Sequence, residues 1–131
     1  MEGAQPTLEP GIERTDEFPV EGHLVTNVGG TIEASVLSTP GMISVMEGCA
    51  TALAYERLPE GWATVGFEVC VKHVSAAPKG ATCRVRATLR EVVEERKLRF
   101  EVEVIEGERT IGIGTHERRI IEPDRLGSAG T

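Results

Sequence analysis

The sequence predicts an α+β fold in which a curved antiparallel β-sheet wraps around one long central helix. A single stretch, Ser38–Leu58, has the apolar spacing of an amphipathic helix. The stretches around it alternate apolar and polar side chains, as half-buried strands do. Short turns join the last four of these strands, which predicts antiparallel neighbours. We expect one domain over residues 12–121, with flexible tails at 1–11 and 122–131.

The chain before the helix contains a first strand and a long loop. The strand Ile12–Val20 carries Pro19, which suits a sheet edge. The segment 21–37 mixes glycines with isolated aliphatic residues, which favours a loop with partial burial. An ordered loop in front of a helix can shape a pocket or serve as a plain connection.

The helix has clear start and stop signals. Thr39 supplies a capping hydroxyl, and Pro40 follows at a position where a missing N–H costs nothing. Pro59 and Gly61 mark its end. One carboxylate, Glu47, falls at the edge of the apolar face.

Four strands follow the helix. They are expected at 62–73, 82–93, 98–104 and 110–121, separated by turns rich in proline, glycine or charge. In the first of them, His73 shares the alternation of the apolar residues Val65, Phe67 and Val69, which predicts that its side chain faces the helix. Gly66 interrupts this strand and indicates either a bulge or a close approach by another group.

Composition excludes several classes of function. The net charge is −7 and no basic cluster is interleaved with aromatic residues, which argues against nucleic-acid binding. No apolar run approaches the ~20 residues of a membrane span, and no signal peptide is visible. Cys49, Cys70 and Cys83 lack the spacing of a metal site, so we expect no metal. Buried free thiols are the plain interpretation, and they predict a cytoplasmic protein.

Three polar side chains are candidates for catalysis: Thr39, Glu47 and His73. A carboxylate and an imidazole on one face are the groups needed for general base catalysis or for activating a water molecule. Thr39 and Glu47 are about 12 Å apart along the helix, so a substrate would lie between or beside them. Each residue also has a structural alternative: a cap for Thr39, a solvent-facing position for Glu47 and a packed histidine for His73. His23, in the loop, and His116, on the polar side of the last strand, are not candidates.

Three segments carry a resemblance to a known family. The strings TPGMISVMEGCA, GFEVCVKHVSAAPKG and GIGTHERRII resemble the hot-dog-fold thioesterases related to fluoroacetyl-CoA thioesterase. The resemblance runs from about Phe18 to Ile121. It implies a hot-dog fold, a homodimer or higher oligomer, and hydrolysis of an acyl-CoA thioester with no cofactor, because coenzyme A is part of the substrate.

The resemblance also implies roles for individual residues. Thr39 would contact or attack the acyl carbonyl, Glu47 would act as nucleophile or as the base that activates water, and His73 would assist proton transfer. Gly66 would let the backbone approach the substrate. Free N–H groups at the helix N-terminus would stabilise the oxyanion. Candidates for the coenzyme A phosphates are the cations Arg84, Arg86, Arg90, Lys97, Arg99, Arg118 and Arg119.

One departure from the family affects the substrate. The fluoroacetyl-specific enzyme carries aromatic residues in the loop before its helix, whereas residues 19–38 contain no Phe, Tyr or Trp. Selectivity for fluoroacetyl-CoA is therefore not expected to transfer. Two alternatives stay open: a non-catalytic acyl-CoA binding protein, and a hydratase or dehydratase. The second lacks support because no D-x-N-P-x-H string is present.

Overall fold

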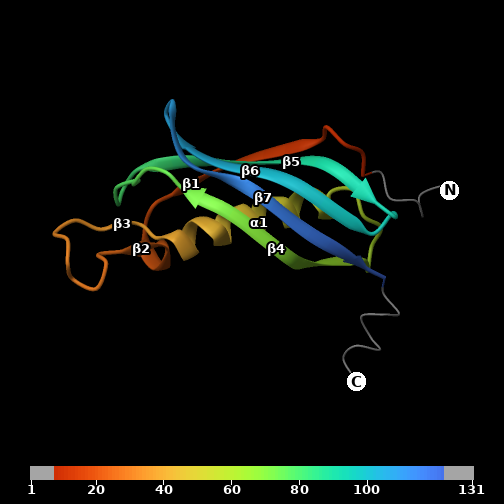
Figure 1. Cartoon of the computed structure of the whole chain (residues 1–131), viewed down its shortest axis with the longest axis horizontal. Helices are drawn as coiled ribbons and strands as arrows, with labels where there is room; N and C mark the ends of the chain where they lie inside the picture. Colours follow the sequence, from red (N-terminus) through yellow and green to blue (C-terminus); the bar gives the residue numbers. More distant parts are fainter. Residues whose placement is uncertain (1–7, 123–131) are drawn as a thin grey trace, which may run out of the picture.

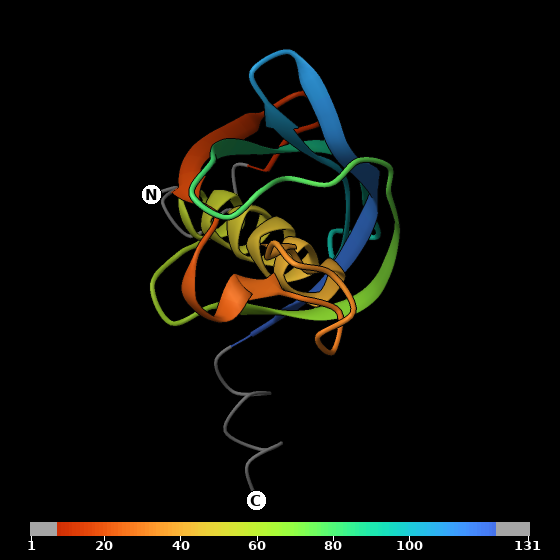
Figure 2. The same ribbon diagram turned by 90° about the vertical axis from the view of Figure 1, so that its left-hand side faces the viewer.

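A five-stranded antiparallel sheet curves around a single long helix (Figures 1 and 2). The computed structural model describes residues 8–122. The sheet has the order β1-β5-β6-β7-β4, and α1 crosses its inner face. The bounds are β1 Glu13–Pro19, α1 Thr39–Tyr55, β4 Ala63–His73, β5 Thr82–Val93, β6 Lys97–Glu106 and β7 Arg109–Ile121.

The predicted pairing is wrong at one connection. Strands β5, β6 and β7 are successive antiparallel neighbours, but β4 pairs with β7 and not with β5. The segment 74–81 therefore crosses to the other side of the sheet, and β4 is left as an edge strand. This arrangement places β4 next to β7 beside the helix.

The loop before the helix is partly regular. A short 3-10 helix, η2 (Gly22–Leu24), leads into β2 (Val25–Thr26), which pairs with β3 (Val36–Leu37). Leu24 and Leu37 are buried, which fixes both ends of the loop on the core. Most of the loop tip between them is exposed.

The helix begins with a different cap from the one predicted. Ser38 is the N-cap, and its hydroxyl accepts a hydrogen bond from Gly41 N–H at 2.9 Å. Thr39 is the first helical residue and Pro40 the second. Because Ser38 performs the capping, the Thr39 hydroxyl is free to make another contact.

The core lies between α1 and the inner face of the sheet. The helix contributes its apolar side, β6 contributes alternate residues as its period predicts, and β5 does so as far as Ala87. The largest fully buried side chains include Phe100, Leu37, Met42, Met46, Leu53, Leu89 and Leu98. The core also includes part of the segment expected to be a tail, since Leu8 packs against it and Gly11 N–H donates to Leu89 O. Residues 1–7 and 123–131 of the expected tails lie outside the described residues.

A β-bulge at Gly66 changes which side chains of β4 face the helix. The register with β7 shifts between Gly66 and Glu68. Beyond the shift His73 keeps its predicted inward side, but Val65 and Phe67 are 45% and 59% exposed on the outside. The prediction of one shared face for the whole strand is therefore wrong, because a bulge inserts one residue and inverts the alternation.

The cysteines are free, but only two are buried. Cys49 and Cys83 lie in the core and Cys70 is exposed on β4, in contrast to the expectation of three buried thiols. Burial raises the pKa of the Cys49 thiol to about 12, so it stays protonated at neutral pH. Within residues 8–122, no helix has the length and apolar character needed to cross a membrane.

Candidate active site

The structure brings Thr39 and His73 into direct contact. Thr39 Oγ1 lies 2.9 Å from His73 Nδ1, within hydrogen-bond distance. Thr39 is exposed at the start of α1 and His73 is half-buried at the end of β4. A hydroxyl on an imidazole nitrogen is the arrangement of a nucleophile and its general base. The capping alternative for Thr39 is not supported, because Ser38 is the cap.

The sheet lets the helix approach closely at this point. His73 is paired with Gly112 of β7, and a Cβ on Gly112 would lie 2.2 Å from Met42 Sδ. The absence of a side chain at Gly112 therefore allows the first turn of α1 to pack beside the end of β4. This packing keeps the Thr39 and His73 side chains within reach of one another.

The second ring nitrogen of His73 is buried. Its Nε2 atom makes no hydrogen bond with any described residue. No described carboxylate therefore orients the imidazole through a hydrogen bond to its second nitrogen, as an aspartate does in a three-residue catalytic triad. Within residues 8–122, the contact is a dyad of hydroxyl and imidazole.

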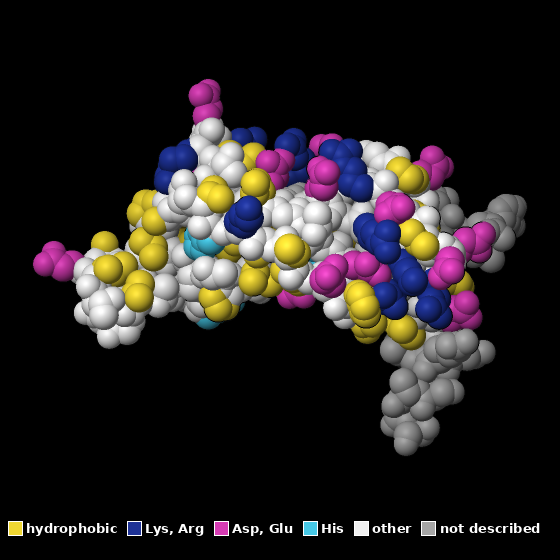
Figure 3. Space-filling view, in the orientation of Figure 1, with side chains coloured by type: hydrophobic (Ala, Val, Ile, Leu, Met, Phe, Trp, Pro, Cys, Tyr) yellow, Lys and Arg dark blue, Asp and Glu magenta, His cyan; other side chains and the backbone are white. Residues whose placement is uncertain are grey.

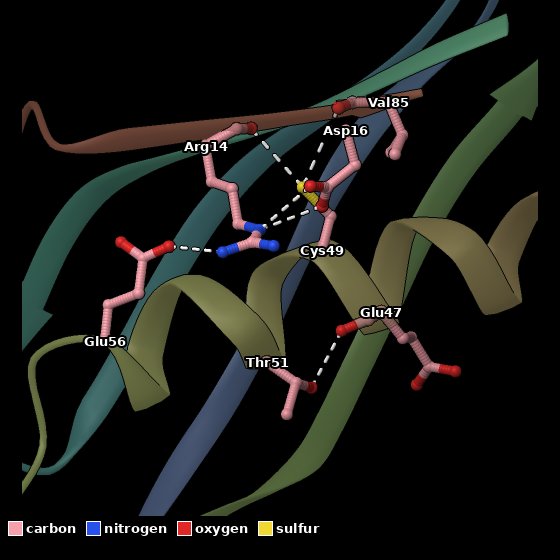
Figure 4. Close-up of polar contacts among 7 residues, drawn as sticks. All are labelled: Arg14, Asp16, Glu47, Cys49, Thr51, Glu56 and Val85. Atoms are coloured by element: carbon pink, nitrogen blue, oxygen red, sulfur yellow. Dashed lines mark hydrogen bonds and ion pairs between the residues drawn. The ribbon is translucent and has the colours of Figure 1, made fainter. Parts of the chain in front are cut away.

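Glu47 is placed with a different group of residues. It is half-buried, and Figure 4 shows its carboxylate directed towards β4, away from the side of α1 that carries Cys49. A Cβ on Gly66 would lie 3.3 Å from Glu47 Oε2. Gly66 therefore has both features that the sequence offered as alternatives: it lies at a β-bulge, and another group, Glu47, approaches it closely. Its missing side chain leaves room for the Glu47 carboxylate.

The other side of α1 fixes the helix to β1. Figure 4 shows Arg14 between the carboxylates of Asp16 and Glu56, and an ion pair joins the guanidinium to each of them. Cys49 Sγ donates to Arg14 O at 3.3 Å. These contacts hold the helix from the side opposite to Glu47, which leaves the Glu47 side open to β4.

Two inward side chains of β7 complete the surroundings of Glu47. His116 and Arg118 are 2% and 8% exposed. Arg118 donates from Nε to Thr64 Oγ1 at 2.7 Å and from Nη2 to Thr64 O at 3.1 Å. Arg118 Nη1 lies 3.1 Å from His116 Nε2 and would lie 3.4 Å from a Cβ on Gly66. Glu47 and Arg118 therefore flank Gly66 with opposite charges.

The sequence prediction placed His116 and Arg118 on the wrong side of the sheet. A register shift between β6 and β7 near Ile105 lets both Ile111 and Gly112 be buried, after which the even-numbered residues of β7 point inward. If inward and outward residues alternated regularly from Ile111, the His116 side chain would lie on the outer face. For this reason His116 is not among the candidates predicted from the sequence. The two glycines Gly112 and Gly114 were the available signal that β7 does not alternate regularly.

Burial governs the charges of this cluster. Burial lowers the pKa of His116, while its hydrogen bond with Glu68 O and the charge of Glu47 act in the opposite direction. Burial also lowers the pKa of Arg118, and the charge of Glu47 opposes this change. Arg118 stays ionised at neutral pH, as arginines in proteins do, and it supplies a fixed positive charge beside the carboxylate.

The helix N-terminus offers fewer donors than predicted. Pro40 has no N–H, Gly41 N–H is bound by the Ser38 hydroxyl, and Met42 N–H donates to Ser38 O. Of the segment 39–42, only Thr39 N–H makes no hydrogen bond with a described residue. The expected set of free N–H groups is therefore reduced to one donor and the positive end of the helix dipole.

The cations proposed for coenzyme A are mostly engaged on the outer face of the sheet. Figure 3 shows basic and acidic side chains intermixed over this part of the surface. Arg86 pairs with Glu103, Arg90 with Glu101, Lys97 with Glu94, Arg99 with Glu91 and Glu117, and Arg119 with Glu117. Arg84 donates to Gly107 O, and Arg118 is internal. Such pairs across strands are typical of a solvated sheet face. Among the described residues, no cluster of His, Cys, Asp and Glu could hold a metal ion.

Adding a methyl group at Gly66 tests the close approach. In Gly66→Ala the Cβ would lie 3.3 Å from Glu47 Oε2 and 3.4 Å from Arg118 Nη1, so we expect the carboxylate to move. Because a displacement of about 1 Å can cost on the order of 10²-fold in kcat, the smaller displacement expected here should lower kcat by about tenfold. The matched control is Gly48→Ala on the exposed side of α1, where a Cβ would meet nothing within 4 Å. The control should keep its activity and gain about 0.5–1 kcal/mol of stability in chemical denaturation. Equal kinetics for the two variants would contradict this geometry.

Comparison with known proteins gives matches over most of the chain. A family model of fluoroacetyl-CoA-specific thioesterases matches residues 20–124. The fluoroacetyl-CoA thioesterase of Streptantibioticus cattleyicolor is 39% identical over 92 residues, which cover 70% of this chain and 65% of that protein. The match therefore spans less than two thirds of the relative's length.

Solved structures resemble the whole described domain. The fluoroacetyl-CoA thioesterase structure matches with a TM-score of 0.81 and 29% identity, over 94% of this chain and 95% of that one. A point mutant in complex with fluoroacetate and coenzyme A matches with a TM-score of 0.78 and 32% identity, over 91% and 99% of the two chains. A hot-dog-like protein from Thermanaerovibrio acidaminovorans has a TM-score of 0.82 at 22% identity, over 92% and 89%. The predicted hot-dog fold is confirmed.

Proposed function

The chain belongs to the family of fluoroacetyl-CoA-specific thioesterases, and from this premise we propose that it hydrolyses acyl-CoA thioesters with Thr39 and His73 as catalytic residues. The observation that carries the proposal is the distance of 2.9 Å between Thr39 Oγ1 and His73 Nδ1. A thioester carbonyl is already activated, so one nucleophile and one base in contact are sufficient to begin the reaction.

The first half of the proposed reaction transfers the acyl group to Thr39. Thr39 Oγ1 attacks the thioester carbonyl carbon while its proton passes to His73 Nδ1. The C–S bond of the tetrahedral intermediate then breaks, and the coenzyme A sulfur takes the proton from His73. The positive end of the helix dipole and the unbound Thr39 N–H lie at this end of α1, where negative charge develops.

The second half releases the acid. Water attacks the acyl–Thr39 ester, and the Thr39 oxygen leaves with a proton, so the products are a carboxylic acid and coenzyme A thiol. We assign to Glu47 the role of base towards this water. Its carboxylate and the Arg118 guanidinium lie on either side of Gly66, so the water would be held between a carboxylate and a guanidinium. The reaction consumes only the thioester and water, so the proposal includes no cofactor.

The acyl group is proposed to differ from that of the named relatives. Their names specify fluoroacetyl-CoA. Residues 19–38 of this chain contain no aromatic side chain, and the tip of this loop is exposed and rich in small residues. A loop of this kind supports a less restrictive entrance, so we propose hydrolysis of several short acyl-CoA thioesters.

A thiol-release assay tests the proposed function. The purified chain is offered a panel of acyl-CoA thioesters, including acetyl-CoA and fluoroacetyl-CoA, and free thiol is followed with a chromogenic disulfide. The proposal predicts turnover of at least one member of the panel. Binding of acyl-CoA without thiol release would instead support a sequestering protein, and hydration of an enoyl-CoA would support a hydratase.

We propose a homodimer formed through the β4 edges. Among the described strands, β4 pairs with β7 alone, so its outer backbone groups are available to a second copy. Val65 and Phe67 are exposed on the same strand, and the Arg119 guanidinium lies 3.6 Å from the Phe67 ring centroid. Light scattering should give the mass of two chains. Phe67→Lys should shift the measured mass towards that of one chain, because it places like charges at the interface between the two β4 strands. A monomeric wild-type chain would exclude this arrangement.

We also propose the cytoplasm as the working compartment. Cys49, Cys70 and Cys83 are all free thiols, and Cys70 is exposed. An exposed free thiol suits a reducing environment.

A further inference from the structure

His116 has two hydrogen bonds whose directions are fixed by its partners. His116 Nδ1 lies 2.8 Å from Glu68 O, and His116 Nε2 lies 3.1 Å from Arg118 Nη1. A carbonyl oxygen can only accept and a guanidinium can only donate. Nδ1 therefore carries the proton and Nε2 accepts. The network specifies a neutral imidazole in one tautomer.

Both partners of His116 are linked to Gly66, which Glu47 approaches closely. Glu68 follows the β4 bulge that brings Gly66 to Glu47, and Arg118 provides the positive charge on the other side of Gly66. We propose that His116 is a positioning residue, which holds the bulge and the Arg118 guanidinium in the arrangement that Glu47 needs. This inference rests on the proposed function of Glu47 and adds a residue that does not itself contact the reacting atoms.

The surroundings of His116 favour the neutral ring. The charged groups that face His116 are Glu47 on α1 and Arg118 on β7, and β4 contributes the uncharged Glu68 carbonyl. On β6 the neighbour is the uncharged Phe100 ring, stacked at 6.3 Å between centroids. Adding a proton at Nε2 would remove the acceptor of Arg118 and place two cations in contact. Burial lowers the pKa of His116, in agreement with this arrangement.

The sign of the pH effect follows. The folded chain binds a proton at His116 less readily than the unfolded chain does. The contribution of the neutral His116 network to the free energy of unfolding is therefore complete above the ordinary histidine pKa of about 6.5. It is lost as the pH falls through the lower pKa of the folded state. Acid strong enough to protonate His116 in the folded chain should therefore weaken its contact with Arg118 and lower the free energy of unfolding.

The first test reads the ring directly. Long-range nitrogen–proton NMR spectra of the wild-type chain report tautomer and charge, and the His116→Gln and His23→Gln variants assign the signals. We expect His116 to carry its proton on Nδ1 at pH 7 and to remain mostly neutral at pH 6.5, where an unperturbed imidazole is about half protonated. A proton on Nε2, or a charged ring at pH 7, would overturn the inference.

The second test separates positioning from simple packing. His116→Ala removes both hydrogen bonds, whereas His116→Gln can return an acceptor to Arg118 without a titrating group. We expect His116→Ala to lower kcat about tenfold to a hundredfold with little change in KM, and His116→Gln to recover part of it and to flatten the acid side of the pH profile. The exposed His23→Gln variant is the matched control. Equal kcat for wild type and His116→Ala would overturn the inference.

A third readout does not depend on activity. The Arg118 side-chain N–H signals should exchange slowly with solvent in the wild type and rapidly in His116→Ala. If the wild-type chain released no thiol while these signals behaved as expected, the proposed function would fail and the positioning of Arg118 by His116 would stand. Unchanged Arg118 signals in His116→Ala would reject the positioning itself.

Discussion

Replacing His73 with alanine should lower kcat/KM for acyl-CoA hydrolysis by about 10²- to 10⁴-fold, the usual contribution of a general base. His73 Nδ1 is the atom in contact with Thr39 Oγ1, and no other described side chain reaches that hydroxyl. Without the imidazole the Thr39 hydroxyl keeps its proton and is a poor nucleophile. Steady-state thiol release over a range of substrate concentrations measures the loss.

Two variants accompany this measurement. His23→Ala changes the same residue type on an exposed part of the loop and should leave kcat/KM unchanged. Thr39→Ser keeps a hydroxyl at the same position and should retain much of the activity. A His73→Ala variant as active as the wild type would show that another group accepts the proton.

Replacing Glu47 with glutamine should separate the two halves of the reaction. The shape of the side chain is kept, but the amide cannot accept a proton from water. We expect a rapid burst of thiol release that approaches one equivalent per chain, followed by turnover slowed by about 10²- to 10⁴-fold. The reason is that the Thr39 hydroxyl is hydrogen-bonded to His73 and makes no hydrogen bond with Glu47, so the first acyl transfer does not require this carboxylate. Stopped-flow detection of thiol measures both phases.

A different role for Glu47 would give a different result in this experiment. If Glu47 were the first nucleophile, Glu47→Gln would abolish the burst together with the turnover. Glu60→Gln, an exposed change in the loop after α1, is the control and should behave as the wild type. An unchanged steady-state rate in Glu47→Gln would remove Glu47 from the mechanism.

Much of the fold follows from local patterns in the sequence. The apolar residues of α1, of β6 and of β5 as far as Ala87 recur with a regular period, so this period alone predicts the inward face of each. Register shifts occur between β4 and β7, between β6 and β7, and also between β5 and β6 after Leu89, but only those of β4 and β7 change which side chains face Glu47. A bulge depends on pairing between distant segments, and alternation within one strand does not locate it.

In the candidate site, too, some features follow from local sequence patterns and others depend on strand pairing. Thr39 and His73 are predicted by their residue types and positions, and the structure places them in contact. The predicted cap is the wrong hydroxyl because Ser38 and Thr39 are adjacent and both suit an N-cap. The environment of Glu47 is not predicted because His116 and Arg118 come from β7, whose inward face depends on pairing with β6.

The most direct test of the account is a double-mutant cycle on Thr39 and His73. Values of kcat/KM are measured for the wild type, Thr39→Val, His73→Ala and the double variant with the best substrate of the panel. Residues that act as one unit are not additive, so the double variant should lose no more activity than His73→Ala alone. Losses that multiply in the double variant would show that the two residues act independently and would contradict the catalytic dyad.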